Sequence, residues 1–129
     1  MSNSIAEIGG YRLLVVGNEG PALTRVQDML DLIGEALPQR VAAIVVPVVR
    51  LDSVFFHLRS GVAGELVQKI VNYRLKLAVL GDISAFTAGS TALSDFVRES
   101  NRGRSIFFLP DMNALAAKLA ELSAGAEQG

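Results

Sequence analysis

The clearest hydrophobic pattern in the chain lies between residues 60 and 80. Over residues 60–74 apolar side chains recur at helical spacing, which predicts a helix with one buried face. That face comprises Val62, Ala63, Leu66, Val67, Ile70, Val71 and Tyr73. Ser60 is placed to act as the N-cap of this helix. Residues 76–80 are almost wholly apolar, which predicts a strand in the interior of a sheet, covered on both faces.

The segments before this unit predict a hairpin, a helix and a further strand. Residues 5–8 and 11–16 are apolar-rich, and Gly9-Gly10 between them suits a two-residue turn. Thr24 followed by Gln27 fits a capping box at the start of a helix that Pro38 ends. The predicted buried stripe of this helix is Val26, Met29, Leu30, Ile33 and Leu37. Residues 41–49 predict a strand that is interrupted or ends at Pro47, because proline cannot donate a ladder hydrogen bond.

The C-terminal third predicts an irregular connection over residues 82–89 and then a helix, a strand and a helix. Ser90 can cap the first helix, and Gly103 suits the left-handed position that closes it. The inward residues of that helix are Leu93, Phe96 and Val97. Residues 106–109 form the last predicted strand. Asp111 caps the final helix, whose inner side is lined by Leu115, Leu119 and Leu122.

Together these elements predict an α/β fold with the order β-β-α-β-α-β-α-β-α. We expect a mixed, mostly parallel sheet of about five strands, covered by four main helices and joined by right-handed crossovers. At 129 residues the chain is expected to form a single domain, residues 1–129. Its core extends from about residue 5 to residue 122, and residues 123–129 are expected to fray.

Composition narrows the classes of function. The formal net charge is -1, which disfavours nucleic acid and anionic membranes as partners. The chain has no cysteine, so disulfides, thiolate nucleophiles and zinc sites built on sulfur are excluded. The N-terminal residues lack the layout of a signal peptide and no apolar run is long enough to span a bilayer, so we expect a soluble, cytoplasmic protein. No motif implies a cofactor or a metal, and His57, the sole histidine, lacks companions for a metal site or a catalytic triad.

Three stretches carry a family resemblance. They are VQDMLDLIGEA, FFHLRSGVAGELVQKIVNYRLKLAVLGDIS and ALSDFVRESNRGRSIFF, which together span residues 26–108. In these stretches the chain resembles the bacterial family known as domain of unknown function 4180, which implies kinship and no particular chemistry. The order of elements also resembles the STAS domain of bacterial anti-sigma-factor antagonists, and fold alone does not fix function.

The STAS resemblance implies a role for one residue, Ser60. In STAS antagonists a phosphorylatable serine lies at the start of the helix after the third strand, in an Asp-Ser-Ser-Gly-like motif. Here that place holds Arg59-Ser60-Gly61. The chain departs from the motif because no acidic residue immediately precedes Ser60 and because residues 52–58 are inserted between the strand and the helix.

A first hypothesis therefore makes this helix the docking element of a non-enzymatic regulatory module that binds another protein. A phosphate on Ser60 would lie at a helix N-terminus beside Arg59, where negative charge is favoured. The polar face of the helix would contact the partner through Glu65, Gln68, Lys69 and Asn72. Glu65 precedes Lys69 by four residues, which favours an ion pair. The alternative interpretation is that Ser60 is only a cap and that this face is only solvated.

A second hypothesis is a small-molecule-binding protein or enzyme. Asp52, Asp82 and Asp111 each follow a predicted strand, and ligands of parallel sheets bind beyond the carboxyl ends of strands. The three carboxylates could meet at a cation or a hydroxyl-bearing ligand. Helix capping explains Asp52 and Asp111 without a ligand, which leaves Asp82 as the principal candidate. A third possibility is a homo-oligomer formed through an exposed apolar face.

Overall fold

The computed structural model describes residues 3–128 and contains one sheet whose strands lie in chain order, β1-β2-β3-β4-β5. The strands are β1 (Ser4–Ile8), β2 (Tyr11–Val15), β3 (Ala43–Pro47), β4 (Lys76–Leu80) and β5 (Ile106–Leu109). β1 is antiparallel to β2, and the remaining neighbours are parallel. The predicted mixed, mostly parallel sheet is confirmed.

Four main helices accompany the sheet, as predicted. They are α1 (Val26–Ala36), α2 (Val62–Asn72), α4 (Thr91–Arg102) and α5 (Met112–Gln128). A short helix, α3 (Ser84–Thr87), lies in the connection that the sequence predicted to be irregular. α5 continues through residues 123–128, where fraying was expected, and residue 129 lies outside the described residues. No helix of the described chain is both long and apolar enough to cross a membrane.

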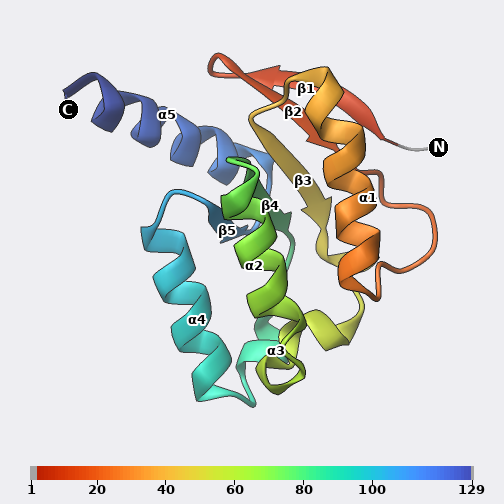
Figure 1. The fold of residues 1–129 in the computed structure, drawn as a ribbon. Helices are drawn as coiled ribbons and strands as arrows, with labels where there is room; N and C mark the ends of the chain where they lie inside the picture. The colour runs from red at the N-terminus through yellow and green to blue at the C-terminus, as the bar shows by residue number, and fades with distance from the viewer. Residues whose placement is uncertain (1–2, 129) are drawn as a thin grey trace.

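The helices form a layer on each face of the sheet (Figure 1). Right-handed crossovers between parallel strands in chain order place their helices on one face. α1, α2 and α4 accordingly pack on the face that carries Leu14, Ile44, Val46, Leu77, Val79 and Ile106. α5 covers the opposite face, where Leu115, Leu119 and Leu122 meet Leu13, Ala43, Val45, Ala78 and Phe107. Successive strand residues therefore enter different cores, which explains why interior strands are apolar throughout.

The strand predictions hold in detail. Gly9 and Gly10 have φ angles of 58° and 85°, and Ile8 pairs with Tyr11, as in a tight two-residue hairpin. β4 lies between β3 and β5, so its predicted interior position is confirmed. β3 ends at Pro47, the residue that was expected to interrupt or finish it.

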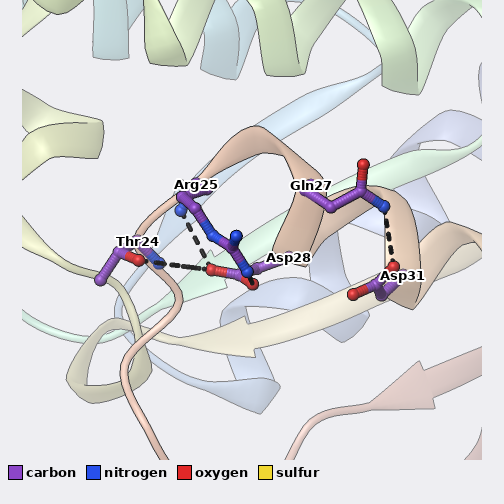
Figure 2. A network of polar contacts seen from close by, with 5 residues as sticks. All are labelled: Thr24, Arg25, Gln27, Asp28 and Asp31. Atoms are coloured by element: carbon purple, nitrogen blue, oxygen red, sulfur yellow. Dashed lines mark hydrogen bonds and ion pairs between the residues drawn. The ribbon is translucent and has the colours of Figure 1, made fainter.

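The start of α1 differs from the predicted capping box. Figure 2 shows that Asp28, not Gln27, bonds the main chain before the helix. Its Oδ2 accepts hydrogen bonds from the amides of Thr24 (2.8 Å) and Arg25 (3.0 Å), and its Oδ1 accepts one from the Arg25 guanidinium at 3.0 Å. Gln27 instead donates to Asp31 at 2.9 Å. The prediction was wrong by one residue because Arg25 is the N-cap, which makes Asp28 the third helical residue.

Two predicted apolar faces differ from those in the structure. In α1 the buried residues are Met29, Leu32, Ile33 and Ala36, of which Leu32 and Ala36 were not predicted, whereas Leu37, predicted to be buried, is 43% exposed. In α2 only Ala63, Leu66 and Ile70 are fully buried. Val71 and Tyr73 are 50% and 46% exposed. Only the side of each helix that contacts the sheet is buried. Val71 lies at the border of that side, and Leu37 and Tyr73 lie beyond the last turn of their helices, so all three are exposed.

The C-terminal capping predictions are confirmed at Ser90 and Asp111. Ser90 accepts the amide of Leu93 at 3.1 Å, and Asp111 accepts the amide of Ala114 at 2.9 Å. Gly103 does not take the predicted left-handed conformation. Its φ of -84° and ψ of -159° are extended, because the chain runs directly from α4 towards β5.

Candidate functional site

The hydroxyl of Ser60 lies just before α2 and makes two local hydrogen bonds. The N-cap is Gly61, with a φ of 80°, so Ser60 lies one residue earlier than predicted, in the last of several short 3-10 turns. Its Oγ donates to the carbonyl of Val54 at 3.1 Å and accepts from the amide of Val62 at 3.2 Å. The exposed hydroxyl therefore ties the preceding loop to the first amide of α2.

The outward face of α2 is polar and accessible, as predicted. Glu65, Gln68 and Asn72 are exposed, Arg59 is exposed before the helix, and Lys69 is half-buried. The expected ion pair is not formed: among residues 3–128 no salt bridge joins Glu65 to Lys69. Exposed pairs of this kind gain little free energy in water, so the geometry of the helix does not enforce them.

Three exposed apolar side chains lie at the C-terminal ends of α1 and α2. Leu37 follows α1, Val71 lies in the last turn of α2, and Tyr73 is its C-cap. α1 and α2 pack against each other, and their C-terminal ends lie at the same end of the molecule (Figure 1). We call Leu37, Val71 and Tyr73 the α1–α2 patch. Sequence reasoning assigned all three to the core because hydrophobicity and spacing alone do not show where a helix leaves the sheet.

The carboxyl ends of β4 and β5 border a cavity of about 550 Å³, which we call the strand-end groove. Residues from both strand ends, from α3 and from α4 line it, among them Asp82, Ser84, Thr87, Ser94, Val97 and Phe108. Ser84 and Thr87 come from α3, Ser94 and Val97 come from α4, and Phe108 comes from β5. The groove thus lies at the carboxyl ends of the strands, where the sequence predicted a ligand site.

The carboxylate of Asp82 is stabilised by a hydrogen bond within its own loop. Its Oδ1 accepts the amide of Ser84 at 2.9 Å, and this bond holds the pKa of Asp82 below its ordinary value. The carboxylate is exposed and ionised at neutral pH. It can therefore accept a hydrogen bond from a hydroxyl or an ammonium group in the groove.

The other two candidate carboxylates cap local turns. Asp52 accepts the amide of Val54 at 2.9 Å, and Asp111 caps α5 as described above. Within residues 3–128 no group of three or more His, Cys, Asp or Glu side chains is placed to hold a metal ion. Asp52, Asp82 and Asp111 therefore do not form the shared cation site that their positions after strands suggested.

Two features were missed in the sequence. The stacked rings of Phe56 and Phe86, 4.2 Å apart between centroids, join the turns before α2 to α3. Beside them lies a second cavity of about 500 Å³, lined in part by the exposed His57 and by Arg59. The stacked pair could not be predicted, because Phe86 falls in the segment expected to be irregular.

The side chain of Arg50 is the second missed feature. Its guanidinium donates to the carbonyls of Gly17 (2.9 Å), Glu19 (2.8 Å) and Pro21 (3.0 Å). Gly20 lies so close that a Cβ atom there would stand 2.9 Å from the guanidinium carbon. Arg50 thus fixes the loop after β2. This structural role could not be predicted from the sequence, because no local pattern links an arginine to a loop about 30 residues earlier.

Comparison with known proteins identifies a family and no relative of known function. A family model described as "Domain of unknown function (DUF4180)" matches residues 8–119. No curated protein and no solved structure matches the chain. The resemblance to STAS domains therefore stays one of element order.

Proposed function

The chain belongs to the DUF4180 family, and for this member we propose a non-enzymatic, cytosolic regulatory role in which the surface of α2 binds another protein. The observation that carries the proposal is the α1–α2 patch. Five large apolar side chains of the described chain are exposed, and Leu37, Val71 and Tyr73 are three of them. Large apolar side chains that stay exposed on or near a helix with a polar outward face are typical of protein-binding surfaces.

The polar residues of α2 would form the rim of that interface. Gln68 and Asn72 offer donors and acceptors along the exposed side of the helix, and Glu65 and Lys69 offer charges of both signs that are not paired with each other. Burial of Val71 and Tyr73 would provide the apolar centre, and the surrounding polar groups would set the register of the partner.

Ser60 would act as the charge switch. A phosphorylated Ser60 has no hydroxyl proton, so it would lose the bond to the Val54 carbonyl and would repel that oxygen. The phosphate would instead be attracted to the N-terminal amides of α2 and to Arg59. Modification would thus detach the turn before α2 from its present position and change the surface presented to the partner.

The test is a pull-down from the native host, with partners and modification at Ser60 identified by mass spectrometry. Wild type is compared with Val71→Glu, Lys69→Glu and Ser60→Asp. Glu121→Lys serves as a charge-changing control on α5, because its side chain is 72% exposed and belongs to the helix on the other face. We expect a partner that binds wild type and the control, and binds the Val71 or Lys69 variant at least about tenfold more weakly.

The purified partner then gives dissociation constants for each variant. If wild type, Val71→Glu and Lys69→Glu bind the partner with equal affinity, the interface does not include α2. Failure to capture any partner would contradict the proposal as a whole, and the absence of phosphate on Ser60 would remove the switch while leaving the docking surface.

A second candidate function is favoured by the strand-end groove. An ionised Asp82 opposite apolar surface from Phe108 and Val97 suits a small ligand that has an apolar body and an ammonium or hydroxyl group. Native mass spectrometry of protein incubated with host metabolite extract would test it. We expect a bound molecule that is lost in Asp82→Asn and retained in Glu121→Lys, and equal retention by both variants would contradict this site.

A further inference from the structure

The two edges of the sheet are finished differently, and a side chain occupies the middle of the β5 edge. The amide of Leu77 donates to the carbonyl of Ser105, just before β5, and that of Gly81 donates to the carbonyl of Leu109, so the main chains of Ser105 and Leu109 face β4. The main chain of Phe108 faces outward. There the side chain of Asn101 donates to the Phe108 carbonyl at 3.1 Å and accepts from its amide at 2.7 Å. Asn101 thus occupies the place of a neighbouring strand.

The β1 edge has no such closure among the described residues. β2 bonds to β3 through the carbonyl of Arg12, which accepts from Ala42, and through the amide of Val16, which donates to Val45. The intervening residues of β2 therefore face β1, and the hairpin register pairs them with residues 4, 6 and 8. It follows that the N–H and C=O groups of Ile5 and Glu7 point away from the sheet, and within residues 3–128 they make no hydrogen bond.

We propose that two copies of this chain associate by pairing β1 with β1, antiparallel, about a two-fold axis. The outward groups of Ile5 and Glu7 in one copy would bond those of the other and join both sheets into one. Several registers bring outward-facing residues opposite one another. A register centred on Glu7 would set two carboxylates face to face, which is unfavourable, and one centred on residue 6 would set Ile5 against the charged Glu7.

The register centred on Ile5 is the one we favour. It places Ile5, whose side chain is 36% exposed, against Ile5 of the second copy. It also sets Glu7 opposite Asn3, so no like charges meet across the new pair. This arrangement removes exposed apolar surface and open hydrogen-bonding groups in the same contact.

The occupant is a second copy because an antiparallel edge is complementary to itself, so a single surface supplies both halves of an isologous contact. The bonds between Asn101 and Phe108 explain why β5 would not take part. If both edges were open, β1 of one copy could add to β5 of the next and the sheet would grow without limit. A strand added along β5 would have to break both bonds of Phe108 to Asn101, so association would stop at the dimer.

Sedimentation velocity of the full chain, over a wide concentration range, tests the proposal with Ile5→Pro. Proline removes only the outward N–H of Ile5, so the hairpin bonds within the chain are kept. We expect wild type to dimerise and Ile5→Pro to have a dissociation constant raised at least about tenfold, with the circular dichroism of the helices unchanged. Ile5→Lys, which keeps the N–H and sets like charges across the axis, should give the same result if the proline variant folds poorly.

Amide hydrogen exchange supplies an independent measurement. The amides of Ile5 and Glu7 have no bond to another described residue of the chain, so they should exchange slowly only in concentrated wild-type protein and rapidly in Ile5→Lys. Wild type that stays monomeric at every concentration would overturn the proposal. So would an undiminished dimer of both Ile5 variants, and a dimer broken by Val71→Glu alone would place the contact on the α1–α2 patch.

Discussion

The carboxylate of Asp28 offers a sharp test of how α1 is anchored. It accepts two main-chain amides, from Thr24 at 2.8 Å and from Arg25 at 3.0 Å, while the Arg25 guanidinium bonds its other oxygen (Figure 2). These amides precede the first turn of the helix, where the helix itself provides no acceptors. Asp28→Ala leaves both without that acceptor, and Asp28→Asn keeps one neutral oxygen that can still bond.

The expected magnitude follows from the two amide bonds. Loss of a capping side chain costs about 0.5–2 kcal/mol, and bonds to an ionised acceptor lie towards the upper part of that range. We therefore expect Asp28→Ala to lower the free energy of unfolding by about 1–2 kcal/mol, and Asp28→Asn by about half as much. The Arg25 ion pair adds little, because that side chain is 71% exposed.

The effect depends on pH in a defined direction. The amide of Thr24, followed by that of Arg25, lowers the pKa of Asp28 in the folded chain. A lowered folded pKa stabilises the protein at pH values above the ordinary carboxyl pKa of about 3.9, and this contribution is lost as the pH falls through the folded value. The stability difference between wild type and Asp28→Asn should therefore be complete at neutral pH and shrink in acid.

Urea denaturation at several pH values measures both quantities. Asp31→Ala is a matched control on the same helix. Among residues 3–128 the Asp31 carboxylate accepts a hydrogen bond only from the side chain of Gln27, at 2.9 Å, so its loss should change stability by less than about 0.5 kcal/mol. Equal losses in Asp28→Ala and Asp31→Ala would refute the capping assignment. A difference between wild type and Asp28→Asn that does not vary with pH would refute the role of the charge.

Three further substitutions have defined outcomes in the same urea assay. Ser60→Ala removes the bonds to Val54 and Val62 and should cost about 1 kcal/mol, whereas no loss would mean that water replaces both bonds. Phe107→Ala should cost about 3–5 kcal/mol because the ring is fully buried against α5, and a loss below about 1 kcal/mol would show that α5 does not hold that face. Gly81→Ala should cost about 1–3 kcal/mol, since the φ of 139° disfavours a Cβ that would lie 3.0 Å from the Val48 side chain; a neutral result would mean that the loop relaxes.

The order of elements was predictable because each depends on residues close together in the chain. An apolar run such as residues 76–80 has few alternatives to an interior strand, and the two sides of the sheet each bury alternate residues of it. Ser90 and Asp111 were correctly identified as caps because the amides they bind lie three residues ahead. Local chemistry was sufficient in these cases.

The exposure of Leu37, Val71 and Tyr73 was not predictable in the same way. Hydrophobic spacing indicates which residues share a helix face, but the width of the buried part depends on how the helix crosses the sheet and where it ends. The strand-end groove has the same origin. Asp82 was singled out from its place after a strand, whereas the wall provided by Phe108 and Val97 depends on the packing of α4 against β5.

Asn101 shows most clearly why the role of a residue can be impossible to predict from the sequence. It lies on a helix whose exposed side carries the ion pairs Asp95–Arg98 and Glu99–Arg102, so its setting indicates only another solvated polar residue. Its role depends on Phe108, seven residues further along, whose outward main chain comes within reach once α4 has packed beside β5. Because a side-chain amide offers the same donor and acceptor as a peptide group, one residue can finish a strand edge without adding a strand. Whether the outward main chain of an edge strand finds a partner is therefore decided by tertiary packing, which the sequence pattern of the strand does not show.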